Sequence, residues 1–303
     1  MQNGWALQCG TSHFLGQNFA KAFDVNFATG STDGHREYVW GTSWGVSTRL
    51  MGATVMTHAD DLGLVLPPAV APVQVVILPI LKKIKASSAF ESDDHRTVLD
   101  ITSKLERLLK KKNVRAKTDV CEGSLLGSRR YEWERKGVPV RLEIGNRDIK
   151  NGEMTAALRY NLNKTKLELP SLSDDAGLEA LADKLSTMLV SIQSDMLRVA
   201  EERQSSLTYN VSSYEDMKII LASAYAVSSS HSQSSIGGCS KGLGLFMAPW
   251  KDNADNELFI KEDCKATIRC FPDSLNVEPP SVGTKCFFSG EQATHVAIFA
   301  RAF

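Results

Sequence analysis

The sequence predicts a protein of mixed α/β and α+β class with more than one domain. Its 303 residues exceed the usual size of a single domain. The 43% hydrophobic and 23% charged residues are typical of folded globular proteins and exclude a collagen-like or disordered chain. Predicted strands and helices alternate between residues 73 and 144, which is the pattern of a partly parallel sheet covered by helices.

The first part of the chain predicts short strands and two helices. Asp24–Ala28 and Tyr38–Thr42 have strand-like composition, and Leu15–Phe23 has the spacing of a short helix. A second helix is expected over about Val46–His58, before a turn at residues 60–63. Prolines at positions 67, 68 and 72 then indicate a linker.

A continuous apolar run, Val73–Ile80, predicts a strand that is buried on both faces. The next segment has apolar residues at helical spacing and ends in three lysines, which suit the C-terminal end of a helix dipole: Val98, Ile101, Leu105, Leu108 and Lys110–Lys112. Strands are expected at Val114–Thr118 and Val138–Ile144, on either side of a helix near Leu125–Arg135.

A longer helix is predicted after Ser173–Asp175, whose side chains suit N-terminal capping. Its apolar residues form a single stripe: Leu178, Leu181, Leu185, Met188, Ile192, Met196 and Val199. The stripe allows either a coiled-coil dimer or, as is more frequent, packing of the helix on its own domain. Ser228–Ser235 then indicates a polar insertion, and residues 244–303 return to strand-like composition.

Charge is unevenly distributed along the chain. The 35 basic and 35 acidic residues cancel, but Lys104–Lys166 holds 17 Lys and Arg against 8 Asp and Glu. Such an excess is expected either of a nucleic-acid-binding face or of solvated helix surfaces, and its sign alone does not decide between them. The longest apolar stretch, Val70–Ile84, is interrupted by prolines, lysines and glutamine, so no membrane-spanning helix is predicted.

Two polar clusters combine small residues with hydroxyl groups: Gln8–His13 and Gly41–Arg49. Small residues let the backbone approach a ligand, and the arginine that ends the second cluster is expected in the first turn of a helix, where it can grip phosphate oxygens. A nucleophilic pair of Ser12 or Ser43 with His13 is a second interpretation, although no G-x-S-x-G elbow is present. An ordinary Gly/Ser/Thr turn is the third.

Two other groups of residues give weaker signals. Gly237–Gly242 faintly resembles a phosphate-binding loop but lacks the G-K-[ST] ending. Glu132 and Glu134, on either side of Trp133, suit hydrogen bonding to base edges better than acid–base catalysis.

Several longer motifs resemble the prolyl-tRNA synthetases, in the archaeal/eukaryotic-like form that carries an extra C-terminal domain. The motifs are Ala6–Phe19, Thr42–Gly52, Met56–Pro68, Tyr131–Gly145 and Val296–Arg301. Their length and order make the resemblance specific. It extends from the first residue to the last, with the serine-rich stretch as an insertion.

This resemblance implies a fold for each part of the chain. Residues 1–70 are expected to form the C-terminal part of a class II antiparallel-sheet catalytic domain with its third signature, and residues 71–172 an α/β anticodon-binding domain. Residues 173–243 are expected to form a long helix and a serine-rich linker, and residues 244–303 a small α+β C-terminal domain. A homodimer is expected of the full-length enzyme. The cytoplasm is the default location, with an organelle as the alternative.

The resemblance also implies a reaction and its residues. A proline–tRNA ligase activates proline with ATP to prolyl-adenylate and transfers the prolyl group to tRNA(Pro). The residues expected to bind ATP are Gln8, Thr11, Ser47 and Arg49, of which Arg49 and Gln8 are expected to be catalytic and Gln8 also to lie near Mg²⁺. His13, Ser43 and Trp44 are expected to form the proline pocket, and Glu134 and Arg141 to read the anticodon guanines.

The chain departs from the family pattern in two ways that bear on function. It begins inside the catalytic domain, without the first two class II signatures, so we expect a truncated gene model or a fragment that is inactive alone. A standalone tRNA-binding module is the alternative. Lys251 and Asn256 occupy the first two positions of a four-cysteine zinc site found in some relatives, which leaves Cys286 alone. Because Cys264, Cys270 and Cys286 also lack a common zinc-ligand spacing, we expect buried free thiols and no zinc.

Overall fold

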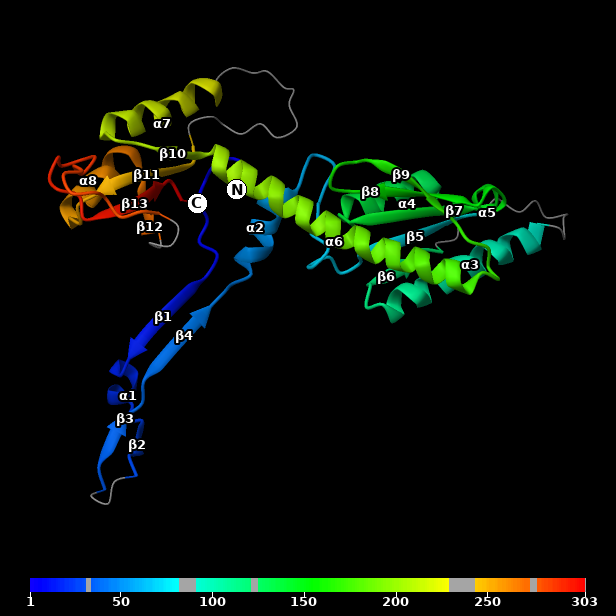
Figure 1. Ribbon diagram of the computed structural model, residues 1–303, viewed down its shortest axis with the longest axis horizontal. Helices are drawn as coiled ribbons and strands as arrows, with labels where there is room; N and C mark the ends of the chain where they lie inside the picture. The colour runs from blue at the N-terminus through cyan, green and yellow to red at the C-terminus, as the bar shows by residue number, and fades with distance from the viewer. Residues whose placement is uncertain (31–33, 82–90, 121–124, 229–242, 273–276, 303) are drawn as a thin grey trace. The chain divides into compact units, whose positions relative to one another are not determined.

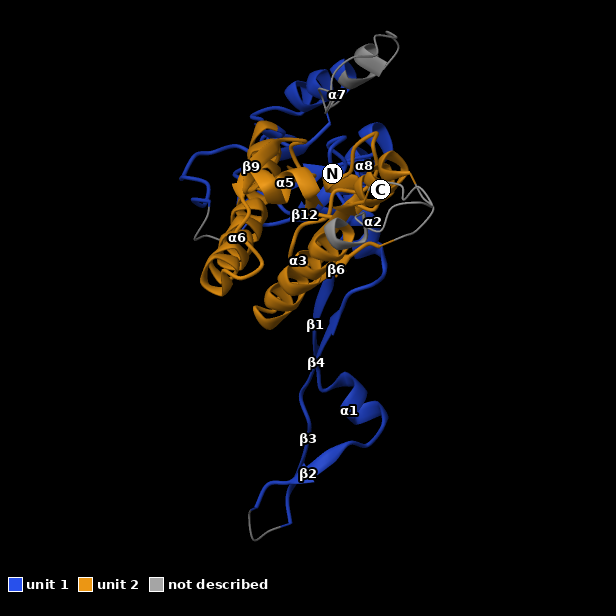
Figure 2. Ribbon diagram, turned by 90° about the vertical axis from the view of Figure 1, so that its right-hand side faces the viewer, with its two compact units in different colours: residues 1–54, 207–233, 239–303 blue, residues 55–206, 234–238 orange. Residues whose placement is uncertain are grey.

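The computed structural model describes residues 1–30, 34–81, 91–120, 125–228, 243–272 and 277–302 (Figure 1). Contacts between residues divide the chain into two compact units, with the boundary inside helix α2 (Arg49–His58) (Figure 2). Unit 1 consists of the described residues up to Thr54 and from Leu207 onward, and unit 2 consists of Val55–Ser206. The polar insertion predicted beyond Ser228 and the Gly237–Gly242 loop lie outside the described residues.

Unit 2 is built on a five-stranded sheet in the order β6-β5-β7-β8-β9. The strands are β5 (Val75–Ile80), β6 (Ala116–Thr118), β7 (Val140–Gly145), β8 (Glu153–Leu158) and β9 (Lys164–Glu168). β5 runs parallel to β6 and β7, whereas β7, β8 and β9 pair antiparallel. Residues 75–78 of β5 are completely buried, as expected of an inner strand covered on both faces. The α/β prediction is confirmed for this part of the chain.

Four helices accompany the sheet: α3 (Glu91–Lys111), α4 (Leu126–Arg135), α5 (Asn146–Asn151) and α6 (Asp175–Ser206). Ile101 and Leu105 of α3 are completely buried in one core with residues of β5 and β7. The burial of one such side chain contributes about 1.5–3 kcal/mol, so the spacing of these residues fixes which face of α3 meets the sheet. Lys110 and Lys111 lie in the last turn of α3, as predicted.

Helix α6 packs on the same core. Its first turn is capped by Asp174, whose Oδ1 accepts a hydrogen bond from the Gly177 N–H at 2.9 Å. The predicted stripe is buried from Leu178 to Met196, with Met188 only partly buried and Val199 exposed. The helix therefore lies on its own domain, and its apolar face is covered without a coiled-coil partner.

The N-terminal part of unit 1 consists of small antiparallel ribbons and two helices. Its elements are β1 (Thr11–Gly16), α1 (Asn18–Ala22), β2 (Asn26–Ala28), β3 (Arg36–Tyr38), β4 (Gly41–Gly45) and the first half of α2. β1 pairs with β4, and β2 pairs with β3. The strand predicted at Tyr38–Thr42 is in fact two strands, because β3 ends at Tyr38 and β4 begins at Gly41, each with a different partner.

Large apolar side chains remain exposed along these ribbons. They are Phe14, Phe19, Phe23, Phe27, Trp40 and Trp44, each at least 47% exposed. The predicted helix Leu15–Phe23 is shorter than expected, because Leu15 and Gly16 complete β1 and Gly16 has a φ of +57° that ends the strand.

The C-terminal part of unit 1 is an α+β module with its own core. It contains β10 (Thr208–Asn210), α7 (Tyr214–Ser228), β11 (Leu245–Trp250), α8 (Ala254–Cys264), β12 (Thr267–Cys270) and β13 (His295–Ala300), with sheet order β10-β11-β13-β12. Trp250, Phe246 and Phe299 are fully buried at its centre. β10 and α7 come from the range predicted as helix and linker, and they pack with this module. None of the helices in the described part of the chain is long and apolar enough to cross a membrane.

Candidate nucleic-acid interface

A pocket of about 220 Å³ opens in unit 2 between the end of α4, strand β7 and the β8–β9 turn. Its lining combines apolar and polar side chains: Trp133, Glu134, Val138, Arg141, Ala157, Leu158, Arg159, Leu162 and Lys164. Sites for whole cofactors or drug-sized ligands usually measure about 300–1,000 Å³, so this pocket is on the scale of a single small group such as one base. It brings together Glu134 and Arg141, the two residues predicted to read guanines.

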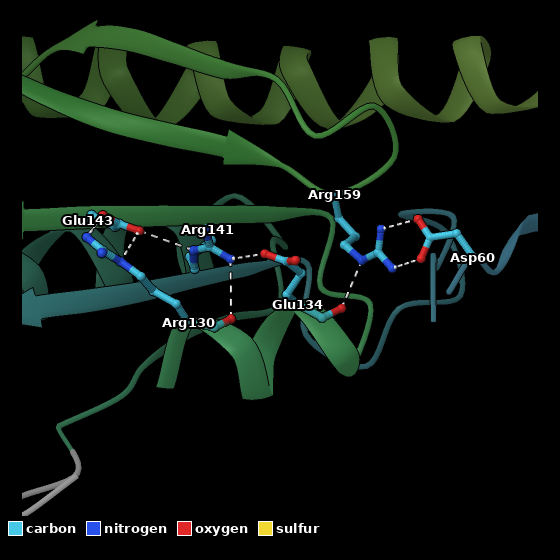
Figure 3. Close-up of polar contacts among 6 residues, drawn as sticks. All are labelled: Asp60, Arg130, Glu134, Arg141, Glu143 and Arg159. Carbon is cyan, nitrogen blue, oxygen red and sulfur yellow. Dashed lines mark hydrogen bonds and ion pairs between the residues drawn. The ribbon is translucent and has the colours of Figure 1, made fainter. Parts of the chain in front are cut away.

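Arg141 is held between two carboxylates (Figure 3). Its Nη1 donates to Glu134 Oε2 at 3.2 Å, and its Nε donates to Glu143 Oε1 at 3.3 Å. Glu143 is itself bound by Arg130, whose Nε lies 2.8 Å from Oε1. The Arg141 side chain is only 11% exposed, so these pairs compensate a charge that would otherwise be costly to bury. The guanidinium is thereby fixed in direction, next to the Glu134 carboxylate.

A second ion pair holds the backbone of Glu134. Arg159, which is nearly completely buried, binds Asp60 through both terminal nitrogens, with Nη1 2.7 Å from Oδ2 (Figure 3). Its Nε donates to the Glu134 carbonyl oxygen at 2.9 Å. The hydrogen bond from Arg159 outweighs the effect of burial and lowers the pKa of Asp60 from its ordinary value. Arg159 thus links the turn after α2 to the end of α4.

The chain after α2 crosses the end of α4 very closely. Leu64 N–H donates to the Arg135 carbonyl at 3.0 Å, and Leu66 N–H donates to the Gly137 carbonyl at 3.3 Å. A Cβ atom at Gly63 would lie 2.6 Å from the Arg135 carbonyl oxygen, and one at Gly137 would lie 2.7 Å from Leu64. Only glycines allow this approach. The sequence indicated the turn at residues 60–63, but gave no sign that Asp60 would meet Arg159.

Part of the positive charge of Lys104–Lys166 is neutralised by ion pairs within the protein. Three of its members bind carboxylates from outside the segment: Lys104 with Asp175, Lys112 with Asp183 and Arg159 with Asp60. Other members lie near Trp133, which lines the pocket. Lys117 and Lys136 stand over the ring of Trp133, with their Nζ atoms 5.6 and 4.7 Å from its centre. The segment therefore combines both interpretations, because some of its cations stabilise the fold and others are available beside Trp133 or, as Lys164, in the pocket lining.

The residues predicted to bind ATP and proline lie on the exposed surface of unit 1. Gln8 precedes β1, Thr11 and His13 lie on β1, Ser43 and Trp44 lie on β4, and Ser47 and Arg49 lie at the start of α2. Thr11 pairs with Gly45 and His13 with Ser43, so these side chains share one face of the ribbon. Trp44 pairs with Ser12 and lies on the opposite face. The structure therefore brings His13 and Ser43 together and separates Trp44 from them.

Arg49 lies in the first turn of helix α2, as predicted, although the helix begins at Arg49 and not near Val46. Its N–H donates to Ser47 Oγ at 3.3 Å, so the two residues of the signature are joined by a local turn. Both side chains are exposed.

The cysteines lie in different environments. Cys264 and Cys286 are buried, whereas Cys270 is exposed, which differs from the expectation of three buried thiols. Burial opposes ionisation of Cys286, but hydrogen bonds from Ser289 and from the backbone of Phe288 and Lys251 lower the pKa of its thiol. Among the described residues, no three His, Cys, Asp or Glu side chains are close enough together to hold a metal ion.

Comparison with known families matches two regions of the chain. A family described as an anticodon binding domain matches residues 74–176, which include the pocket. A family described as the C-terminal domain of prolyl-tRNA synthetase matches residues 240–303.

Curated relatives align with the whole chain. Enzymes named proline–tRNA ligase from Flavobacterium johnsoniae and Cytophaga hutchinsonii are each 41% identical over 303 residues, and one from Pelodictyon phaeoclathratiforme is 39% identical over 309 residues. The alignments cover 100% of this chain but 53–55% of those relatives, so the chain spans about half their length.

A solved structure shows the same fold. It is the crystal structure of prolyl-tRNA synthetase from Cryptosporidium parvum complexed with halofuginone and AMPPNP. It is 31% identical in sequence and superposes with a TM-score of 0.77, covering 99% of this chain and 55% of that one.

Proposed function

We propose that the chain belongs to the prolyl-tRNA synthetase family and that it supplies the tRNA-reading part and one signature of the active site of a proline–tRNA ligase. The substrates of the whole enzyme would be proline, ATP and tRNA(Pro). The observation that carries this proposal is the pocket in unit 2, which joins Glu134 to Arg141 inside the region that matches an anticodon binding domain.

In the proposed complex, Glu134 and Arg141 bind the edge of an anticodon guanine. A carboxylate accepts hydrogen bonds from guanine N1 and N2, while a guanidinium donates to O6 and N7. Because the Arg141 charge is compensated by Glu134 and Glu143, the ion pairs hold both side chains in place without an unpaired buried charge. A base that enters finds both readers already oriented, which lowers the entropic cost of binding.

Unit 1 is proposed to contribute to activation of proline. Gln8, Thr11, Ser47 and Arg49 would hold ATP, with Arg49 placing a fixed cation beside the phosphates. His13 and Ser43 would face proline from the ribbon, and Trp44 would take part only by contacts on the other face. For Mg²⁺, the residues proposed here offer the amide oxygen of Gln8 and the hydroxyl oxygens of Thr11 and Ser47 but no carboxylate, which does not make a magnesium site, so no step is assigned to the metal.

We further propose that this chain alone binds tRNA without forming prolyl-adenylate. Adenylation needs cations around the α-phosphate, and the sequence contains only the third of the three class II signatures. Homodimerisation and a cytoplasmic location are proposed for the whole enzyme by analogy with its family.

The proposal is tested by measuring the affinity of the 303-residue chain for tRNA(Pro) in a filter-binding assay at several salt concentrations. Glu134→Gln and Arg141→Lys should each weaken binding about 5- to 150-fold, the equivalent of 1–3 kcal/mol per base contact. The matched control is Lys166→Ala. Lys166 lies on β9 and forms an exposed ion pair with Glu153 of β8, so this substitution should change the affinity less than threefold.

Proline-dependent pyrophosphate exchange on the same preparation should be undetectable. Exchange above background would refute the division of labour proposed here, and equal affinity for tRNA in all variants would refute the assignment of the pocket.

A further inference from the structure

Leu162 has a backbone conformation that its residue type rarely adopts. Its φ is +60°, in the left-handed region where a Cβ atom crowds the following carbonyl. The other non-glycine residues of the described chain with positive φ are Asp24, Asn113 and Lys265, all of them polar. Leu162 is the apolar residue among these four. Its side chain cannot form a hydrogen bond that would offset the energetic cost of this backbone conformation.

The strain sits in the β8–β9 turn. Leu158 N–H donates to the Asn163 carbonyl at 2.8 Å, and Asn163 N–H donates to Asn161 Oδ1 at 3.0 Å, which together close the turn around residue 162. Asparagine tolerates the left-handed region much better than leucine does. Asn161 and Asn163 flank this position, but the residue in the left-handed conformation is the leucine.

Burial does not explain the leucine either. Its side chain is 48% exposed, although it lines the same pocket as Glu134 and Arg141. Trp133 and Val138, which are buried, complete the apolar walls. The strained turn therefore holds a half-exposed apolar group in the lining of a pocket whose Glu134 and Arg141 side chains are paired with each other.

We propose that Leu162 is a base-contacting residue that covers the flat face of the purine whose edge is bound by Glu134 and Arg141. This inference rests on the function proposed above. A nucleobase has a broad apolar face and an edge of donors and acceptors, and the pocket lining offers both apolar side chains and the ion pair of Glu134 with Arg141. Binding of the base would bury the exposed half of the leucine and so compensate the strain of its backbone.

Leu162→Asn tests the proposal because strain and binding predict changes of opposite sign. Relief of strain should raise the melting temperature of the chain by about 2–4 °C. Loss of the apolar cover should raise the Kd for an RNA stem–loop carrying the tRNA(Pro) anticodon about 5-fold or more. Leu197→Ala, at a leucine on α6 that is also exposed (57% against 48%), is the control and should leave the Kd within twofold.

A stem–loop that lacks one anticodon guanine base at a time locates the contact. The Kd of one such RNA should be the same for Leu162→Asn and the unsubstituted chain, since the base that the leucine covers is absent. An unchanged Kd on the intact stem–loop would overturn the inference, as would a lower melting temperature together with weaker binding, which would make Leu162 a packing residue. Failure of the unsubstituted chain to bind the intact stem–loop would instead refute the proposed function, and the inference with it.

Discussion

Replacing Asp60 with alanine should loosen the end of helix α4, because it removes the carboxylate that holds Arg159. The Arg159 side chain is 3% exposed and Asp60 is 31% exposed, so the guanidinium would remain buried with only the Glu134 carbonyl as a partner. Removing one partner of a buried ion pair costs about 3–5 kcal/mol. Water can reach Asp60, so we expect about 2–4 kcal/mol here.

Hydrogen exchange measured by mass spectrometry reports this change locally. Amides in peptides that cover residues 130–140 should exchange about 30-fold to several-hundred-fold faster in Asp60→Ala, as follows from tenfold for each 1.4 kcal/mol. Asp61→Ala is the matched control, since Asp61 is exposed and has no ion pair among the described residues. Exchange rates for Asp60→Ala that stay within threefold of the control would refute the reasoning.

The same ion pair predicts a pH dependence. Folding lowers the pKa of Asp60, so the stability that it contributes is present above the unfolded pKa of about 3.9 and is lost as the pH falls through the folded value. Asp60→Ala should therefore remove part of the acid sensitivity of α4. The double variant Asp60→Ala/Arg159→Met, which leaves no buried charge, should exchange more slowly than Asp60→Ala alone.

Two further predictions concern the same unit. Burial, and then the charge of Arg203, lower the pKa of His58, so stability should fall as the pH drops below the unfolded pKa of about 6.5, and His58→Gln should flatten this slope in thermal melts. An unchanged slope would contradict the prediction. Gly137→Ala should destabilise the chain by about 2 kcal/mol or more in urea unfolding, because φ is +74° and the new Cβ would lie 2.7 Å from Leu64. Gly127→Ala, in helix α4 with no atom within 4 Å of the new Cβ, should instead stabilise it by about 0.5–1 kcal/mol; equal effects of the two substitutions would contradict the steric argument.

Elements with a strong apolar period could be predicted from the sequence. The run at Val73–Ile80 and the stripes of α3 and α6 bury their side chains in one core, so the pattern and the packing express the same constraint. The ribbons before residue 46 do not follow such a pattern. Their aromatic side chains are exposed in the chain as described, so burial did not mark where β3 ends and β4 begins.

Only some residues of the pocket could be predicted from the sequence. Glu134 and Arg141 came from a family motif, and the structure brings them into contact. Asp60 and Arg159 are 99 residues apart, and neither lies in a periodic pattern. The strain at Leu162 depends on a backbone angle that no composition or spacing reveals. These residues depend on how the chain crosses itself, and such crossings leave no local signal.

The crossing of α4 by residues 60–66 has a practical consequence for anyone who cuts this protein into recombinant pieces. The matched anticodon-binding region starts at residue 74, but a fragment begun there would lose Asp60 and the N–H donors of Leu64 and Leu66. Arg159 would then lack its carboxylate partner, and the carbonyl groups of Arg135 and Gly137 would lack their N–H donors. The far end is equally misleading, because Arg203 of α6 donates to the Thr57 carbonyl at 2.7 Å, well beyond residue 176. A piece spanning residues 55–206 keeps both ties, and it is the natural unit for isotope labelling or crystallisation with RNA.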